Sequence, residues 1–398
     1  LVEGADRFLL RQLESSITAR QKYWQRDFTS AEAYVASVAE NRRRFAHQLG
    51  VRDARPHDTE PRYQATVNKS SLVGRGPHYE IHAVTWAAFG DVHARGLLLE
   101  PTGIPIRAQV IAVPDCNVLP EQLVGLLPGV APESQYARRL AENGCRVLVP
   151  LLVNREARLP QLTHREWLYR AAFEMGRGLI AYEVQQILAA VDWMERDGGS
   201  AAPIGVFGWG EGGLLSLYAG ALDTRITATG VSGYFDSRQQ IWTEPLDRNV
   251  FGLLDEFGDA ELATLIAPRA LVVEASLAPE VDIPGGRGAP AKIVTPDIER
   301  VRAEIARARQ LTTGLAPSPT ITLVESETGR GPGGSDQALL AFLKALRIEE
   351  PSLEAGSEPT SFLGDFDAAP RHANLVHQLD RHTKFLLSES HYLRHENT

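Results

Sequence analysis

A chain of 398 residues, of which 43% are hydrophobic and 23% charged, has the composition of a folded globular protein and can bury a large core. Its formal net charge is −9, and Lys and Arg gather only in short clusters such as residues 42–44, which argues against a nucleic-acid-binding protein. No apolar run approaches the roughly 20 residues that span a bilayer, so no membrane span is expected.

The first 50 residues predict an N-terminal helical segment, because apolar residues such as Phe8, Leu13 and Ile17 recur at helical spacing. Three segments with β-strand character follow, separated by turn signals: Tyr63–Leu72, His78–Ala87 and His93–Leu99. They predict an antiparallel meander on the N-terminal side of the main sheet.

From residue 108 onward the chain alternates between apolar strands and amphipathic helices. The predicted strands are Ala108–Val113, Cys145–Val153, Ile204–Phe207, Ile226–Val231, Leu271–Ala275 and Thr320–Val324. The predicted helices are Ser134–Asn143, Arg165–Arg177, Ile180–Met194, a helix ending at Ala221, Ile298–Leu311 and Gln337–Leu346. Such alternation predicts an α/β fold with a mostly parallel central sheet and helices on both faces.

These patterns divide the chain into four parts: a helical segment at 1–50, an α/β domain at 51–348, a linker at 349–370 and a C-terminal helix at 371–398. The linker is rich in Pro, Gly, Ser and acidic residues. The C-terminal helix carries an apolar stripe, so it needs a surface to pack on. That surface is expected on this domain, on a second copy of the chain, or on a further domain.

The most informative stretch is the glycine-rich turn at residues 204–215, which follows a strand and opens a helix. In a serine hydrolase such a turn is a nucleophile elbow, Gly-x-nucleophile-x-Gly, whose sharp backbone needs small flanking residues. Aligning Gly208 and Gly212 with the flanking glycines puts Gly210 at the nucleophile position. Glycine has no side chain that could attack a carbonyl group.

The same stretch also matches the dinucleotide fingerprint Gly-x-Gly-x-x-Gly, as Gly208, Gly210 and Gly213, with Asp236 as the acid that would hold a ribose. That fingerprint normally opens the first βαβ unit, whereas here a meander and two strand–helix units come first. The elbow is therefore favoured, and a dinucleotide-binding α/β protein remains an alternative.

The other members of a Ser-His-acid triad can be sought by position. The acid should follow the strand at 271–275, where Glu274, Glu280 or Asp282 could serve. The histidine should lie in the loop after the last strand, but residues 325–334 contain none, and the next histidine is His372. Because a serine nucleophile needs a base within hydrogen-bond reach, two of the three members are missing from their expected places.

Several stretches are typical of one hydrolase branch: 164–167, 178–193, 205–215, 230–235, 257–262 and 266–269. With them the chain resembles the dienelactone-hydrolase and acetyl-xylan-esterase-like branch of the α/β-hydrolases from about Ile106 to Leu346. The resemblance implies the α/β-hydrolase fold, a carboxylic-ester hydrolase lineage and a carbohydrate or small ester as ligand. It also implies that the chain is the catalytically degenerate N-terminal domain of a bacterial tandem hydrolase. In such a protein the second domain would hold a complete triad.

Two carboxylates near the turn have competing interpretations. Glu211 could be a substitute nucleophile or base, but an acid in the first turn of a helix is also favoured by the helix dipole. Asp115 follows the strand whose loop would supply an oxyanion-hole amide, so it could line a pocket, or it could simply cap a turn. Glu274 is the other weak catalytic candidate.

A polar and aromatic group begins the predicted helix at His164, Arg165, Glu166 and Trp167. It could bind an anionic or sugar ligand, or it could be a capping box formed by Thr163 and Glu166. The predicted pocket residues are Asp115, His164, Arg165, Trp209, Gly210 and Glu211. The late histidines (His372, His377, His382, His391 and His395) follow no ligand spacing, so neither a metal nor a cofactor is expected.

The sequence therefore predicts a pseudoenzyme, an α/β-hydrolase domain that serves as a structural or binding partner of an active domain or of a second copy of itself. An active esterase that uses a substitute carboxylate is the alternative within the same fold. The chain starts at Leu1 rather than Met, which suggests a processed product, so a secreted or periplasmic location after signal removal is the expectation.

Overall fold

The computed structural model describes residues 2–67, 69–159, 162–197, 202–283, 290–352, 354 and 356–396, with side chains up to residue 390. Within these residues, eleven strands form the main sheet: β1 (Arg62–Tyr63), β2 (Leu72–Arg75), β3 (Tyr79–Phe89), β4 (Val92–Pro101), β5 (Ala108–Val113), β6 (Cys145–Pro150), β9 (Ile204–Trp209), β10 (Ile226–Ser232), β11 (Ala270–Ala275), β14 (Ile321–Glu325) and β15 (Thr360–Ser361).

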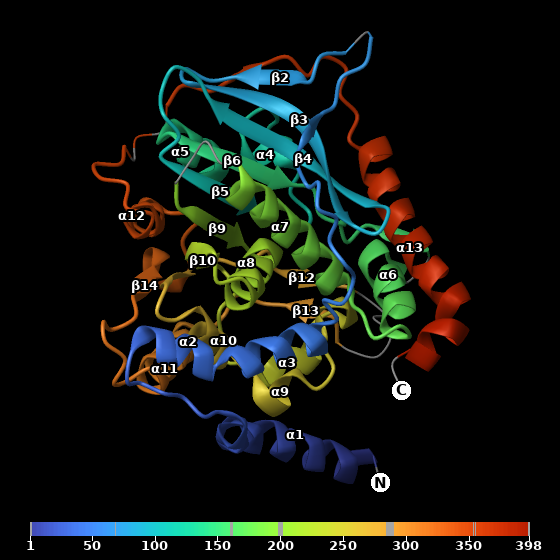
Figure 1. The fold of residues 1–398 in the computed structure, drawn as a ribbon, viewed down its shortest axis with the longest axis vertical. Coiled ribbons are helices and arrows are strands. Elements are labelled where there is room, and N and C mark those ends of the chain that lie inside the picture. The colour runs from blue at the N-terminus through green and yellow to red at the C-terminus, as the bar shows by residue number, and fades with distance from the viewer. Residues whose placement is uncertain are drawn as a thin grey trace.

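The strand order is β14-β11-β10-β9-β5-β6-β4-β3-β2-β15, with β1 paired to β3 off this path (Figure 1). The strands from β14 to β6 run parallel, and β2, β3 and β4 form the predicted antiparallel meander, which joins the parallel part through the β4–β6 pair. Two short hairpins lie outside the main sheet: β7 (Ala157–Leu159) with β8 (Leu162–Thr163), and β12 (Val281–Asp282) with β13 (Lys292–Ile293). The mostly parallel sheet that the sequence predicts is confirmed.

The α-helices of the described residues surround this sheet: α1 (Val2–Ala19), α2 (Ala31–Ser37), α3 (Ala39–Leu49), α4 (Pro120–Leu123), α5 (Tyr136–Glu142), α6 (His164–Phe173), α7 (Leu179–Arg196), α8 (Glu211–Leu222), α9 (Leu253–Glu256), α10 (Asp259–Ile266), α11 (Ile298–Leu311), α12 (Asp336–Ala345) and α13 (Ala369–Glu396).

The sheet separates two hydrophobic cores, because successive side chains of a strand point to opposite faces. In β5, Val110 and Ala112 belong to the core that also contains residues of α5 and α12. Ile111 and Val113 belong to the other core, with residues of α7, α8 and α10. Both faces of β5 are therefore buried, which explains why its residues are apolar on both faces except Gln109, whose side chain donates to the Met194 carbonyl (2.9 Å).

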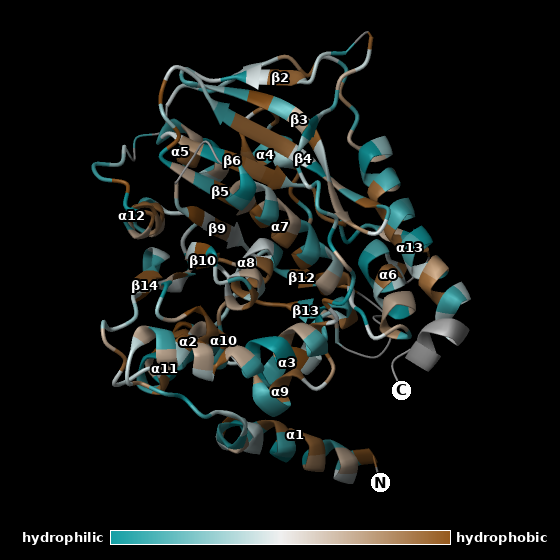
Figure 2. Cartoon of the chain, viewed as in Figure 1, coloured by the Kyte–Doolittle hydropathy of each residue, from teal (hydrophilic) through white to brown (hydrophobic). Residues whose placement is uncertain are grey.

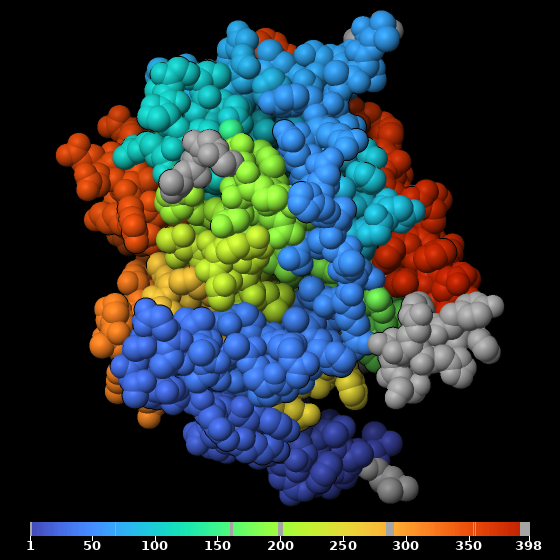
Figure 3. Space-filling model, viewed as in Figure 1, coloured from blue at the N-terminus to red at the C-terminus, as the bar shows by residue number. Residues whose placement is uncertain are grey.

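The predicted N-terminal helical segment is present, and its two later helices pack tightly on the domain. Tyr34, Val38, Phe45 and Leu49 of the α2–α3 region are buried, and the Phe45 ring meets that of Tyr218 on α8 edge-on at 5.2 Å. Figure 3 shows these helices covering one end of the molecule, with the following chain running from them towards β2.

Helix α1 differs from α2 and α3, because none of its residues is buried. Phe8 and Leu9 are 51% and 59% exposed, and Figure 2 shows apolar residues along the outside of this helix. The predicted apolar face is therefore only partly covered, through the contact of α1 with α9.

The predicted strand Tyr63–Leu72 is wrong, because two short strands, β1 and β2, occupy its ends. Both pair with β3, β1 opposite Val84–Thr85 and β2 opposite Glu80–His82. Between them the chain turns back on itself, with an isolated bridge between Thr66 and Lys69. A local turn therefore interrupts the β-strand pattern.

The described residues of the segment predicted as a linker, 349–370, contact the domain at several places. Within it β15 pairs with β2, and the backbone N–H of Phe362 donates to the Val73 carbonyl (2.8 Å). Farther upstream, Asn143 exchanges side-chain hydrogen bonds with the backbone of Ser352 (2.8 Å each). These contacts hold the segment against the sheet edge and α5.

The C-terminal helix packs on its own domain, against β4 and α6. Leu375, Val376 and Leu379 are buried there, and Arg371 forms a two-point ion pair with Glu121 (2.7 Å each). Leu386 is also largely buried, and Leu375, Leu379, Leu386 and Leu393 are the residues of the predicted apolar stripe. Leu393 and the histidines His391 and His395 lie outside the described side chains. Among the described residues, no helix combines the length and apolar character that a membrane span needs.

Candidate functional site

The glycine-rich turn has the geometry of a nucleophile elbow. Between β9 and α8, Gly210 adopts φ 61° and ψ −118°, a conformation that a side chain strains. A Cβ atom on Gly212 would collide with the carbonyl oxygen of Val113, and one on Gly208 would collide with the backbone of Gly212. The small residues of the motif are therefore required by close packing at the ends of β5 and β9.

The space that a nucleophile's side chain would occupy is filled by other residues. A Cβ atom built on Gly210 would lie 2.6 Å from Cγ of Pro279 and 2.8 Å from Oδ2 of Asp115. Pro279 presents a rigid ring, and Asp115 is held by hydrogen bonds, so neither is a freely moving chain end. A side chain at Gly210 would therefore be crowded by both residues.

The carboxylate of Asp115 lies at the turn between β9 and α8. Its Oδ2 accepts a hydrogen bond from the backbone N–H of Glu211 (3.1 Å), and its Oδ1 accepts one from the N–H of Asn117 (3.0 Å). In an α/β-hydrolase, the amide that follows the nucleophile is one of the two that stabilise the reacting oxygen. Here a carboxylate of the protein, only 1% exposed, already uses that amide.

Glu211 lies at the base of the turn, fully buried and surrounded by arginines. Its carboxylate accepts hydrogen bonds from Arg155 (2.6 Å), Arg165 (2.8 Å) and Arg248 (2.8 Å). Burial acts to raise the pKa of Glu211, but the three guanidinium groups outweigh burial and hold its pKa well below the ordinary value. Glu211 is therefore a permanently charged member of a buried ion-pair cluster.

Two further acids complete this cluster. Glu183 from α7 binds Arg165 through both carboxylate oxygens (2.9 and 3.0 Å), and Oδ2 of Asp247 accepts from the Nε of Arg165 (2.7 Å). Three arginines and three carboxylates thus meet here, each side chain at most 3% exposed, and Arg248 also pairs with the less buried Glu244 (3.0 Å). Motif reasoning missed Glu183, Asp247 and two of the arginines, although an acid inside the otherwise apolar start of α7 is a signal that could have indicated a buried partner.

Glu274 is also engaged by the protein itself. Its carboxylate accepts hydrogen bonds from the N–H groups of Gly334 (2.7 Å) and Ser335 (2.9 Å), and from the hydroxyl of Ser232 (2.5 Å). The loop in which a catalytic histidine was sought is therefore fastened to Glu274 through its backbone. A Cβ atom on Gly333 of that loop would collide with Trp209, so position 333 leaves no space for a larger side chain.

The other candidate acids and histidines lie apart from the elbow contacts. Glu280 accepts a hydrogen bond from the hydroxyl of Thr295 (2.8 Å), and Asp282 pairs with Lys292 (3.0 Å). The His164 ring meets that of His372 edge-on at 5.2 Å, and Nε2 of His372 accepts from the N–H of Asn154 (3.0 Å). Burial lowers the pKa of both rings.

The predicted capping box is present at the start of α6, where the Thr163 hydroxyl and the Glu166 carboxylate each accept from the other residue's backbone N–H. Within the described residues, no group of three or more potential metal ligands gathers at one place.

The two groups that a dinucleotide would need, the N-terminus of α8 and Asp236, already have partners within the protein. The carboxylate of Asp115 sits at the N-terminus of α8, where a pyrophosphate would bind, and would repel it. Asp236, the predicted ribose ligand, forms an ion pair with Arg300 (2.9 Å). This geometry favours the elbow interpretation of the glycine motif.

A cavity of about 270 Å³ adjoins the elbow. Trp209, Tyr136, Val118 and Leu277 are among its mostly apolar lining residues, and Asp115 contributes to one side. Of the other predicted pocket residues, His164, Arg165, Gly210 and Glu211 do not line it. Two of its polar wall groups have partners, since Nε1 of Trp209 donates to the Leu277 carbonyl (2.7 Å) and the Tyr136 hydroxyl donates to that of Val113 (2.6 Å).

In sequence, no protein-family model and no curated protein matches this chain. In structure it is similar to a Bacteroides fragilis protein assigned as an acetyl xylan esterase, with 14% identity, 84% of this chain and 88% of that chain covered, and a TM-score of 0.56. It is similar to the glucuronoyl esterase of Solibacter usitatus (16% identity, 81% and 94% covered, TM-score 0.51). A third similar structure is a glucuronoyl esterase of Teredinibacter turnerae (12% identity, 82% and 89% covered, TM-score 0.50).

At such low identity these similarities establish the fold. Together with the strand order and the elbow between β9 and α8, they show that the chain has the α/β-hydrolase fold, as the sequence predicted.

Proposed function

We propose that this chain is a non-catalytic α/β-hydrolase domain of carbohydrate-ester hydrolase lineage, which binds a ligand beside its elbow without hydrolysing it. The similar structures, which are named as acetyl xylan and glucuronoyl esterases, support this lineage. In such a protein the ester chemistry belongs to another domain or another protein, as the resemblance to tandem hydrolases implies.

The observation that carries the proposal is the occupied elbow. Hydrolysis through an acyl-enzyme requires a nucleophile, a base and free amide donors for the oxyanion. At this elbow the nucleophile position is Gly210, Pro279 and Asp115 fill the adjacent space, and the carboxylate of Asp115 holds the oxyanion-hole amide of Glu211.

Two carboxylates were candidates for substitute catalysis, and the contacts of both support structural roles instead. Glu211 is enclosed by three arginines, and Glu274 is hydrogen-bonded to Ser232 and to the loop before α12. A nucleophile or base must reach the substrate, but the side chain of Glu211 is 0% exposed and Glu274 is 1% exposed.

The cavity beside the elbow is the proposed ligand site. Its volume of about 270 Å³ and its apolar walls suit the acyl or alkyl portion of a small ester. Trp209 presents an indole ring there, and aromatic rings of this kind also pack against sugar rings.

The first experiment measures hydrolysis of p-nitrophenyl acetate by the purified chain, together with labelling by a fluorophosphonate probe of serine hydrolases. We expect neither turnover nor labelling. Turnover that survives repurification, with the label on a serine of this chain, would overturn the proposal. Ser232→Ala would then identify or exclude the buried serine beside Glu274.

The second experiment measures binding, by ligand-detected NMR with acetylated xylo-oligosaccharides and with methyl glucuronate. We expect Trp209→Ala, which removes one wall of the cavity, to weaken binding. Trp242→Ala is the matched control, because Trp242 is 45% exposed and does not line this cavity. A folded chain that binds neither ligand would contradict the binding role, while leaving the absence of catalysis intact.

A further inference from the structure

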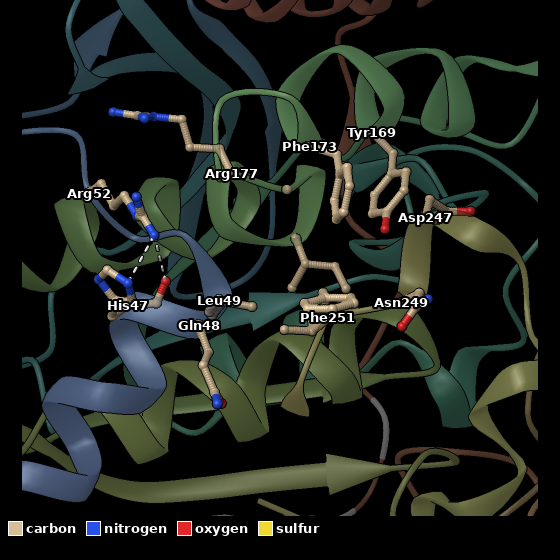
Figure 4. A pocket seen from close by; sticks show the side chains of 14 residues that line it. His47, Gln48, Leu49, Arg52, Tyr169, Phe173, Arg177, Asp247, Asn249 and Phe251 are labelled. Atoms are coloured by element: carbon tan, nitrogen blue, oxygen red, sulfur yellow. Dashed lines mark hydrogen bonds between the residues drawn. The ribbon is translucent and has the colours of Figure 1, made fainter. Parts of the chain in front are cut away.

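A second cavity, which we call the α3–α6 pocket, lies away from the elbow between the C-terminal ends of α3 and α6 (Figure 4). Its volume is about 320 Å³, and His47 and Leu49 line it from α3, Tyr169 and Phe173 from α6, and Asn249 and Phe251 from the loop before α9. This volume suits one ring-sized ligand rather than an oligomer.

The polar groups of this pocket include several that the protein leaves unpaired. Tyr169 is only 6% exposed, and its hydroxyl makes no hydrogen bond with any described residue. Figure 4 shows this hydroxyl pointing into the space between Phe173 and Asn249. Oε1 of Gln48, another lining residue, is also buried without a partner among the described residues. Because buried polar atoms are normally hydrogen-bonded, the Gln48 oxygen indicates a missing partner, and the Tyr169 hydroxyl is free to bond a ligand.

A cation stands at the rim of the pocket. Arg52 forms no ion pair with a described carboxylate, and its guanidinium contacts only Nε2 of His47 (3.1 Å) and the His47 carbonyl (3.5 Å). The neighbouring Arg177, by contrast, is paired with Asp53 (2.9 Å). Burial, and then the charge of Arg177, lower the pKa of Arg52, so a bound anion would stabilise its charged form.

Aromatic rings form the wall opposite Leu49. Tyr169 and Phe173 stack with their centroids 5.8 Å apart, and Phe173 meets Phe251 edge-on at 6.4 Å. Phe251 is 78% exposed and Phe173 is 46% exposed, so both side chains are accessible to a ligand. In Figure 4 these rings lie between Arg52 on one side and Asp247 on the other.

The pocket is separate from the elbow. Asp247 lines it, but the carboxylate of Asp247 is paired with Arg165, which in turn binds Glu211. The buried ion-pair cluster therefore stands between the two cavities, and none of the residues that line one also lines the other.

We propose that the α3–α6 pocket binds a small cyclic hydroxy acid, with its carboxylate on Arg52, its ring against Phe173 and Phe251, and a hydroxyl group on Tyr169. A guanidinium recognises a carboxylate through paired N–H donors, and an aromatic wall accepts the flat face of a phenolic ring or the C–H face of a sugar ring. The chemistry shared by a phenolic acid and a sugar acid thus fits the site. The proposal does not rest on the closed elbow.

The test is isothermal titration calorimetry of the full chain with 4-hydroxybenzoate and with glucuronate, each beside its neutral analogue, 4-hydroxybenzyl alcohol or methyl glucoside. We expect at least one acid to bind at least about 10-fold more tightly than its neutral analogue, because the analogue lacks the charge-assisted contact with Arg52. Binding of 4-hydroxybenzoate alone would assign the site to phenolic acids, and binding of glucuronate alone would assign it to sugar acids.

Three variants locate the binding. Arg52→Gln should weaken it at least about 10-fold, because it removes a charge-assisted contact, and Tyr169→Phe should weaken it about 3-fold or more. Arg43→Gln removes the same charge from an exposed position on α3 and should leave binding unchanged. Binding of neither acid, equal binding of the neutral analogues, or binding that is lost in Trp209→Ala but not in Arg52→Gln would overturn the proposal.

Discussion

The cavity beside Gly210 and the α3–α6 pocket have similar volumes, but they differ in how far their polar side chains are hydrogen-bonded within the protein. Beside the elbow, Asp115 holds two backbone amides, and the Trp209 and Tyr136 side chains donate to backbone carbonyls. In the α3–α6 pocket, the hydroxyl of Tyr169 has no partner among the described residues, and the guanidinium of Arg52 contacts only His47.

This contrast distinguishes a closed site from an open one. A polar group buried without a partner costs about 1–3 kcal/mol, so internal pairing of the polar groups beside the elbow stabilises the fold. At the elbow the carboxylate of Asp115 accepts the backbone N–H of Glu211. Unpaired groups beside aromatic rings instead indicate a place where a ligand completes the hydrogen bonds.

The largest loss of stability is expected at Glu211, which joins the turn between β9 and α8 to the buried ion pairs. Glu211→Gln removes the buried carboxylate on which Arg155, Arg165 and Arg248 converge, so the free energy of unfolding should fall by about 3–5 kcal/mol in urea denaturation. Glu40→Gln is the matched control, because Glu40 pairs with arginines at a side-chain exposure of 52%. It should change stability by less than about 0.5 kcal/mol. A loss below about 1 kcal/mol for Glu211→Gln would contradict the structural role of this acid.

The occupied nucleophile position predicts the next largest effect. Gly210→Ser adds backbone strain and forces a side chain against Pro279 and Asp115, which should destabilise the chain by about 3 kcal/mol without creating esterase activity. Gly103→Ser separates the two contributions, because Gly103 also has a positive φ but a Cβ atom added there would meet nothing within 4 Å. If both variants lost the same stability in thermal unfolding, the elbow would have room for a side chain after all.

A pH-dependent effect is expected beside the α3–α6 pocket. At Asp53, burial acts to raise the pKa, but the adjacent His382 and Arg177 outweigh burial and lower the pKa to about 2. Since the folded-state pKa lies below the unfolded one, Asp53 stabilises the fold fully above about pH 4, and this contribution is lost as the pH falls towards about 2. Asp53→Asn should remove about 2 kcal/mol at about pH 6 and much less at about pH 2.5, as measured by urea denaturation at both values. An equal loss at both pH values would rule out the ion pair as its source.

The smallest expected change in stability comes from removing one tyrosine hydroxyl in each cavity, which compares the two cavities directly. Tyr136→Phe removes the hydrogen bond to the Val113 carbonyl and should cost about 1–2 kcal/mol, because that oxygen loses its phenol donor in a buried place. Tyr169→Phe removes a hydroxyl that has no partner among the described residues and should change the free energy of unfolding by less than about 0.5 kcal/mol. Similar losses of stability in the two variants would show that the two hydroxyl groups do not differ in hydrogen bonding.

Much of this fold was predictable from local sequence. A short apolar run between turn residues indicates a buried strand, and apolar residues at helical spacing indicate an amphipathic helix. The strand at Ala108–Val113 and the helix at Ile298–Leu311 have the bounds that the sequence predicted. The region at 63–72 was not predictable in this way, because its β-strand pattern continues through a turn that only the pairing with β3 reveals.

At the candidate site, local sequence is enough to place Gly210 at the tip of an elbow and to show that the later loop has no histidine. What surrounds that glycine depends on long-range packing. Pro279, Asp115 and the three arginines around Glu211 come from segments far apart in the chain, and no local pattern encodes their meeting. The α3–α6 pocket is likewise built from separate segments, since unpaired polar groups are a property of packing in space and leave no periodic trace in the sequence.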